Sequence, residues 1–137
     1  MEKIIIKAFE DDFSELQAEK EMFGLQTKNS DTLSDELIDK LSNYFSNKID
    51  DFMVFDATDT PYTMFKIEFV MYKFFIIVLN YDRGRFGCSI TNGSHFIALD
   101  SSQKWYDKAD MDIFLKELKE QIELRIPDKF LEHYDWK

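Results

Sequence analysis

The chain has few of the residues on which disulfide bonding, metal binding and tight turns commonly depend. Its 137 residues include one cysteine, two histidines, four glycines and two prolines. The single cysteine, Cys88, excludes an intramolecular disulfide, and its isolation favours a reducing compartment. Because glycine and proline are common turn formers, their scarcity predicts few or short loops.

Long hydrophobic runs are also missing. The apolar run near the start, residues 4–6, has three residues, whereas a signal peptide needs about 7–15. The longest unbroken apolar run in the most apolar region, residues 74–79, has six residues, whereas a membrane span needs about 20. These observations predict a cytoplasmic protein without an export signal.

Basic residues are scarce relative to acidic ones, and the imbalance lies in one part of the chain. The net charge is −10, from 27 Asp and Glu against 17 Lys and Arg. Residues 1–60 hold 15 acidic and 6 basic residues, an excess of nine, while residues 61–137 hold 12 and 11. Such a charge repels the phosphates of nucleic acids and anionic membranes and attracts a basic protein. We therefore expect a basic protein partner, and neither nucleic acid nor membrane.

Apolar side chains, by contrast, are plentiful. They make up 45% of the chain and include 14 phenylalanines, which is ample material for a hydrophobic core. Disordered chains combine high charge with low hydrophobicity, so this composition indicates a folded protein. At this length we expect residues 1–137 to form a single domain.

Hydrophobic spacing predicts two helices before residue 50. Residues 11–23 have approximate spacing of three to four, and residues 33–47 have it more regularly. Asp31 or Thr32 is expected to cap the second helix. Its apolar face consists of Leu33, Leu37, Ile38, Leu41 and Phe45.

Two further helices are predicted near the C-terminus. The first covers about 110–125 and is capped by Asp107 or Asp110. Pro127 should end it, because the residue before a proline is pushed out of the helical region. Pro127 then fits the first position of a short terminal helix that carries Phe130, Leu131 and Tyr134.

Between the helices the hydrophobic period changes to two, which is typical of strands. Residues 74–81 are apolar on both faces and should lie at the centre of the sheet. Turns are expected at residues 56–61 and 82–84, and Asn92-Gly93 predicts a hairpin turn of type I′. The predicted fold is α+β, an antiparallel meander of four or five strands packed with N-terminal and C-terminal helices. The expected strands are residues 3–9, 52–55, 65–69, 74–81, 86–91 and 95–99.

Patterns for catalysis or metal binding are weak. Asp56 and Asp59 follow a strand, but Mg²⁺-dependent aspartate phosphotransferases need a spacing of two rather than three. His95 and His133 lie on different elements, which argues against a shared metal. Cys88 alternates in phase with its apolar neighbours and should be buried as a small hydrophobic residue. We expect no catalytic residue, no metal and no cofactor.

Carboxylates are the remaining candidates for a site. For any one of them, a solubilising or capping role is the common alternative. As a set they would form one acidic surface if the helix at 33–47 packs near the strand that begins at 51, and such a surface speeds association with a basic partner. Tyr62 is a candidate aromatic anchor beside them. The acidic candidates are Asp31, Asp35, Glu36, Asp39, Asp50, Asp51, Asp56 and Asp59.

The short, acidic, Phe- and Lys-rich chain without catalytic motifs resembles the immunity proteins of bacterial polymorphic-toxin and contact-dependent growth inhibition systems. The tail Arg-Ile-Pro-Asp-Lys-Phe-Leu, residues 125–131, is also similar to tails of small bacterial proteins of this kind. The resemblance implies tight one-to-one binding of a cognate toxin domain, often a basic nuclease, whose site the acid would block by mimicking phosphate. Because immunity families differ in fold, it carries over no individual binding residue. The alternatives are an adaptor or assembly subunit, and an enzyme without a recognisable motif.

Overall fold

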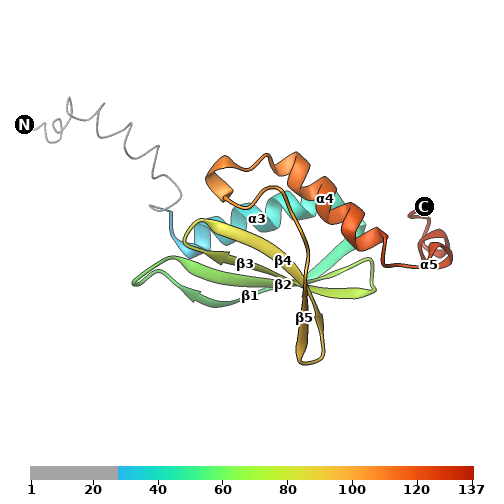
Figure 1. Ribbon diagram of the computed structural model, residues 1–137, viewed down its shortest axis with the longest axis horizontal. Coiled ribbons are helices and arrows are strands. Elements are labelled where there is room, and N and C mark those ends of the chain that lie inside the picture. Colours follow the sequence, from blue (N-terminus) through green and yellow to red (C-terminus); the bar gives the residue numbers. More distant parts are fainter. Residues whose placement is uncertain (1–27) are drawn as a thin grey trace, which may run out of the picture.

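Over the part of the chain that the structure describes, the protein has an α+β fold in which two long helices lie against a five-stranded sheet (Figure 1). The computed structural model describes residues 28–137. The strand expected over 3–9 and the helix expected over 11–23 lie outside the described residues. Helix α3 (Ser30–Phe45) and the 3₁₀ turn η1 (Ser46–Lys48) precede the sheet.

The sheet is an antiparallel meander in which each strand pairs with the next one in sequence. The order β1-β2-β3-β4-β5 confirms the predicted topology and puts the most apolar strand, β3, in the centre. The strands are β1 (Ile49–Thr58), β2 (Met64–Met71), β3 (Phe75–Asp82), β4 (Arg85–Asn92) and β5 (His95–Ala98).

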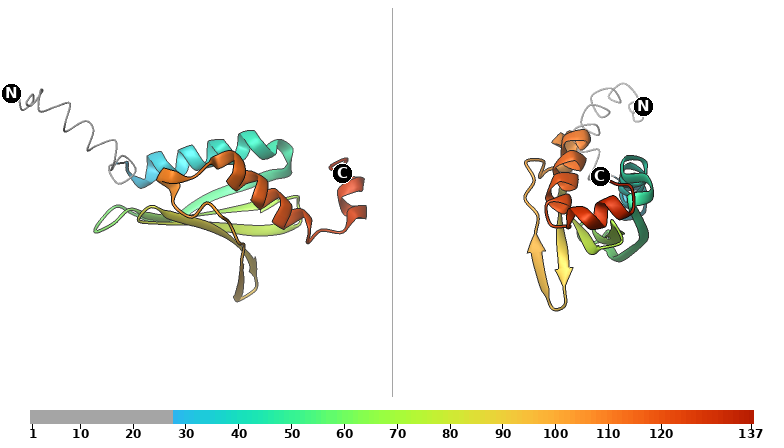
Figure 2. Two further views of the ribbon diagram at one scale, coloured as in Figure 1. Left: turned by 45° about the horizontal axis from the view of Figure 1, so that its top comes forward. Right: turned by 90° about the vertical axis from the view of Figure 1, so that its right-hand side faces the viewer.

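The two faces of the sheet differ. Helices α3 and α4 (Met111–Glu123) lie on one side, which we call the covered face, while the other side, the open face, carries no helix of residues 28–137 (Figures 1 and 2). Alternation along β2 turns one set of side chains into the core and leaves the other set partly exposed. On the covered face, Phe65 stacks on Tyr81 with ring centroids 4.8 Å apart. Both side chains are buried.

Helix α3 forms because a leucine recurs every fourth position and the first turn is capped. Leu33, Leu37 and Leu41 are completely buried. The cap is Asn29, whose side-chain oxygen accepts a hydrogen bond of 2.8 Å from the Thr32 N–H. The expected cap, Asp31 or Thr32, is wrong because the helix begins at Ser30, three residues before its first leucine.

Strand β1 is longer than expected and contains two β-bulges. The residues that oppose β2 slip by one between Asp50 and Met53, and again between Phe55 and Thr58. The strand therefore continues through residues 56–58, where a turn was expected, and the turn follows it. Each bulge inserts one residue, so the apolar alternation loses its phase and hides the length of the strand.

Two of the connecting turns use other residues than the sequence suggests. In the hairpin between β2 and β3, Tyr72 and Lys73 both have positive φ, 58° and 51°, without a glycine or asparagine. Between β4 and β5, Asn92 pairs with His95 and the turn residues are Gly93-Ser94. Of these two, only Gly93 has a positive φ, which is the pattern of type II′ rather than the predicted type I′.

The C-terminal segment closes the core at one end of the sheet. Asp110 caps α4 by accepting hydrogen bonds from the N–H groups of residues 112 and 113, as one of the two predicted caps. Helix α5 (Asp128–His133) follows, and Pro127 is its N-cap rather than its first residue. The Tyr72 hydroxyl donates a 2.6 Å hydrogen bond to Glu123, so the β2–β3 turn is fastened to the end of α4.

Candidate partner-binding surface

The outer side of α3 presents a row of carboxylates. Asp31, Asp35 and Asp39 are four positions apart, and all three are exposed. Residues with this spacing lie above one another on a helix, so the three negative charges are neighbours. The leucines of α3 are buried against the sheet, so the side of the helix that carries these three aspartates faces solvent. This part of the predicted acidic set therefore lies together.

Glu36 belongs to the same helix but faces its neighbours in the fold. Its carboxylate accepts hydrogen bonds from the Tyr106 hydroxyl (3.2 Å) and from the Lys28 ammonium group (2.8 Å). The pKa of Tyr106 is raised well above its usual range, mainly because the residue is buried. The negative charge of Glu36 and the hydrogen bond that the Tyr106 hydroxyl donates to it raise this pKa further. Tyr106 lies in the 3₁₀ turn η2 (Tyr106–Lys108), so Glu36 joins α3 to the segment before α4.

Asp59 is also engaged within the fold. It accepts hydrogen bonds from the Ser30 N–H (2.8 Å), the Ser30 hydroxyl (3.1 Å) and the Thr63 hydroxyl (3.2 Å). The carboxylate thereby ties the first turn of α3 to the loop between β1 and β2. A negative charge at this end of a helix is favourable, because the N-terminus carries the positive end of the helix dipole.

Asp51 and Asp56 occupy the two bulges of β1. Their φ angles are 60° and 53°, in the left-handed region that most residues avoid. Aspartate is tolerated there better than most residues, because its short polar side chain forms local hydrogen bonds. Asp56 also forms a 3.4 Å ion pair with Lys66 on β2. Both aspartates therefore have a structural reason for their position on this edge strand.

Asp50, near the start of β1, and Tyr62, in the loop between β1 and β2, complete the predicted set. Asp50 is exposed and pairs with Val70 of β2 on the open face. The Tyr62 ring is half exposed and lies beneath the Arg83 guanidinium, 4.7 Å from the ring centroid. Asp59, Tyr62 and Arg83 line a recess of about 360 Å³ between the β1–β2 and β3–β4 turns. Tyr62 is thus close to Asp59 but is not part of the α3 row.

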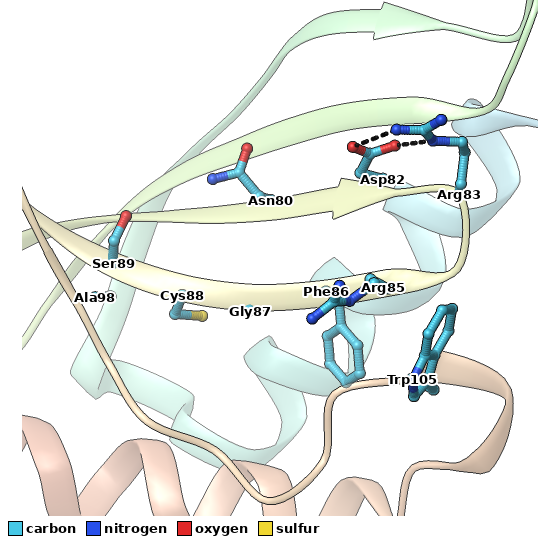
Figure 3. Close-up of a pocket in the computed structure, with 10 residues that line it drawn as sticks. All are labelled: Asn80, Asp82, Arg83, Arg85, Phe86, Gly87, Cys88, Ser89, Ala98 and Trp105. Atoms are coloured by element: carbon cyan, nitrogen blue, oxygen red, sulfur yellow. Dashed lines mark hydrogen bonds and ion pairs between the residues drawn. The ribbon is translucent and has the colours of Figure 1, made fainter.

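A larger hollow, which sequence reasoning missed, lies beside β4. It measures about 580 Å³, and Figure 3 shows Arg85 and Trp105 at one end of it and Ser89 and Ala98 at the other. The chain leaves the edge of β4 after Leu99, whose N–H donates to the Cys88 carbonyl. It returns where the Lys104 carbonyl accepts from the Phe86 N–H.

Gly87 lies at the middle of this gap. A Cβ atom built there would contact nothing within 4 Å, so the space above this position on the open face is free of protein atoms. The Arg85 guanidinium lies over the Trp105 ring at 5.4 Å. A glycine in the interior of a strand was the available sequence signal, because glycine there often marks a close approach of another chain or ligand.

The residues weighed for catalysis or metal binding lie apart. Cys88 is buried, as predicted, and burial raises the pKa of its thiol to about 12, so the reactive thiolate is disfavoured. His95 lies at the exposed start of β5 and His133 at the exposed end of α5. Within residues 28–137, no group of three or more His, Cys, Asp or Glu side chains is placed to hold a metal ion.

Within the same range, no helix combines the length and the apolar character needed to cross a membrane. Comparison of the chain with protein-family models, with curated proteins and with solved structures finds no match. The arrangement of the described residues is therefore the basis for a functional conclusion. It offers an exposed acidic helix face, an acidic sheet edge and a sheet face that no described helix covers.

Proposed function

We propose that the protein is a non-enzymatic immunity protein that binds a basic toxin domain in the cytoplasm and covers its active site or substrate groove. The observation that carries the proposal is the exposed row of Asp31, Asp35 and Asp39 on α3. The resemblance to small acidic immunity proteins supports the same conclusion.

The fold explains only part of this row. Asp31 lies in the first turn of α3, where the helix dipole favours a negative charge. Asp35 and Asp39 lie beyond that turn, and like charges four positions apart destabilise a helix by about 0.2–0.5 kcal/mol per pair. Carboxylates kept at such positions are best explained by a partner that neutralises them. Glu36, Asp51, Asp56 and Asp59 have roles within the fold and supply additional negative potential.

Inhibition would need no chemistry. The long-range field of the carboxylates accelerates encounter with a basic surface, with association rates up to about 10⁸–10⁹ M⁻¹s⁻¹ at low salt. A toxin that acts on nucleic acid has a basic substrate groove, and the α3 carboxylates would occupy the positions of substrate phosphates. Tyr62, half exposed in the loop between β1 and β2, would provide an aromatic contact at the margin of the interface.

A second candidate is an adaptor or assembly subunit. It is favoured by the apolar side chains on the open face, where Met53, Ile76 and Phe96 are 50%, 45% and 65% exposed. Apolar docking predicts an affinity that changes little with salt, whereas occlusion by carboxylates predicts an affinity that falls as salt rises.

The test is co-expression with the C-terminal domain encoded by the adjacent upstream gene. The immunity proposal expects that this domain stops growth, that the present chain restores growth, and that the two co-purify at low salt. A domain without toxicity that forms no complex with the chain would contradict the proposal.

Variants then locate the interface. Asp35→Asn with Asp39→Asn should slow association about tenfold and leave the dissociation rate less affected, because the row acts mainly on encounter. Glu120→Gln with Glu132→Gln removes two exposed carboxylates from the C-terminal helices and is the matched control. Equal association rates in both double variants would remove α3 from the interface.

A further inference from the structure

The open face of the sheet carries an apolar patch, which we define as Met53, Val70, Ile76 and Phe96, and these side chains surround Val78, which is itself buried and only 4% exposed. Three of these side chains are prominently exposed, with Phe96 the most exposed at 65%. They come from all parts of the sheet, since β1 supplies Met53, β3 supplies Ile76 and β5 supplies Phe96. The patch is therefore a property of the assembled sheet and not of one strand.

Strand register brings these side chains together. Directly opposed residues of antiparallel strands point to the same face and lie about 4.5–5.5 Å apart. Val70 opposes Ile76, and Thr91 opposes Phe96. The Thr91 hydroxyl donates a 3.3 Å hydrogen bond to the Ile76 carbonyl, which joins the two pairs into one row. In the adjacent row Met53 opposes Glu68, which opposes Val78.

The β4–β5 hairpin borders the patch on one side. The end of the β4–β5 hairpin bends to the side away from α3 and α4, so it stands beside the open face (Figure 2). The hollow of about 580 Å³ beside β4 continues from the patch, because Ser89 opposes Val78 and Ala98 opposes Ser89. A partner lying on the patch can therefore extend a side chain into this hollow.

The charges around the patch select one kind of occupant. Asp50 opposes Val70, and Glu68 lies between Met53 and Val78, so the two rows contain two carboxylates and no cation. The next row supplies Lys66, which is paired with Asp56 at 3.4 Å. Arg85 lies at the far end of the hollow, where its guanidinium is over the Trp105 ring. A second copy of the chain would bring carboxylates against carboxylates, whereas Lys or Arg beside an apolar centre would complement this surface.

We propose that the open face is a docking surface for a protein partner whose contact surface has an apolar centre bordered by Lys or Arg. This inference goes beyond the immunity role, because it rests on neither the α3 carboxylates nor a toxin. The apolar centre provides affinity through burial of area, and Asp50 and Glu68 orient the partner.

Model peptides test the proposal without knowledge of the natural partner. The probe is an amphipathic helical peptide of leucine and lysine, and its matched controls replace lysine by glutamate or leucine by serine. Binding is followed by backbone amide NMR shifts of the full chain. The leucine–lysine peptide should bind most tightly and shift the amides around Ile76, Val78, Glu68 and Phe96.

Three results would overturn the proposal. Shifts centred on α3 would assign the peptide to the acidic row, and equal binding of the serine–lysine peptide would show that charge alone is recognised. Self-association in sedimentation experiments that disappears in Ile76→Thr would assign the patch to a second copy. A failure of the toxin experiment leaves this outcome unaffected, because the peptide assay contains no toxin.

Substitutions sharpen the assignment. Ile76→Thr combined with Phe96→Ser should weaken the leucine–lysine peptide about tenfold, and Glu68→Gln should weaken it less. Ile113→Thr is the matched control, since Ile113 on α4 is 44% exposed and Ile76 is 45% exposed. Glu120→Gln is the control for charge. Loss of binding in the controls, or retention in the patch variants, would contradict the proposal, and circular dichroism checks that each variant is folded.

Discussion

The covered and open faces of the sheet are built from the same strands under different physical demands. In β3, Ile77 and Leu79 are completely buried beneath the helices, while Ile76 and Asn80, on the other face, are exposed. Close packing against the helices restricts which side chains fit on the covered face. The open face lacks this restriction and can carry apolar and charged residues in combinations that suit a partner. The contrast teaches that burial explains one face of this protein and that the other face needs a functional explanation.

The largest difference should appear when each face loses an apolar side chain. Leu79→Ala on the covered face should lower the free energy of unfolding by about 2–5 kcal/mol, because it leaves a cavity in the core. Ile76→Thr on the open face should change it by about 0.5 kcal/mol or less, since the side chain is half in solvent. Urea unfolding of both variants gives the two values. Equal losses would break the contrast between the faces.

Alkaline titration should distinguish the tyrosines that lie between the helices and the sheet. Burial raises the pKa values of Tyr72, Tyr81 and Tyr106 above the ordinary value of 10.0. A raised pKa in the folded state stabilises the protein below pH 10, and this stability is lost as the pH rises above 10. Between pH 10 and 11 the loss should be about 1 kcal/mol each for Tyr72 and Tyr106, whose pKa values are raised most.

The measurement is absorbance at 295 nm together with urea unfolding at each pH. At pH 11 the folded protein should contain fewer ionised tyrosines than the urea-unfolded chain, which has six in total. Identical ionisation in both states would show that these hydroxyls reach solvent.

The edges of the sheet offer a third comparison. Asp51→Val and Asp56→Val should each lower stability by about 1–2 kcal/mol, because a β-branched residue is strained at positive φ. Asp51→Gly, the matched control, should retain or increase stability, since glycine adopts this conformation freely. If the valine variants instead restore regular pairing of β1, this edge strand loses the bulges that hinder pairing with another chain. The protein should then aggregate, which light scattering detects. Equal stability of the valine and glycine variants would contradict a structural role of the bulges.

The smallest effect concerns the acidic row of α3. Asp35→Asn with Asp39→Asn should leave stability unchanged or raise it by about 0.2–0.5 kcal/mol, because repulsion between neighbouring carboxylates is removed. Thermal unfolding at low and high salt measures this difference, which should shrink as salt screens the charges. A clear loss of stability would give these carboxylates a structural role and weaken their assignment to a partner.

Periodicity in the sequence predicted most of the architecture, and the departures have physical causes. The leucine spacing of α3 and the alternation in β2 and β4 report burial directly, so those elements were found. Strand β1 was found only in part, because its two bulges break the alternation. The turn through Tyr72 and Lys73 carries no turn residue, because burial of Tyr72 and its bond to Glu123 hold a backbone that the local sequence disfavours.

The candidate surface was predictable to a similar degree. Net charge and helix spacing were enough to place Asp35 and Asp39 on α3 within an acidic set, whereas Asp31 was one of the two expected caps of this helix and proved to lie in its first turn. The engagement of Glu36 by Tyr106, and of Asp59 by Ser30, depends on residues far apart in the chain. The apolar patch and the hollow depend on strand register across the whole sheet, which no single segment encodes.

The meander order has a consequence for how the protein folds while it is synthesised on the ribosome. Each strand pairs with the one made just before it, and such short-range closure is rapid. The contacts from Tyr72 to Glu123 and from Glu36 to Tyr106 must instead wait until η2 and α4 have been synthesised. While α4 is still being synthesised, part of the covered face lacks its helix and is a hazard for aggregation. The interval between synthesis of the last strand, β5, and synthesis of α4 is therefore the one in which a chaperone would protect these elements most.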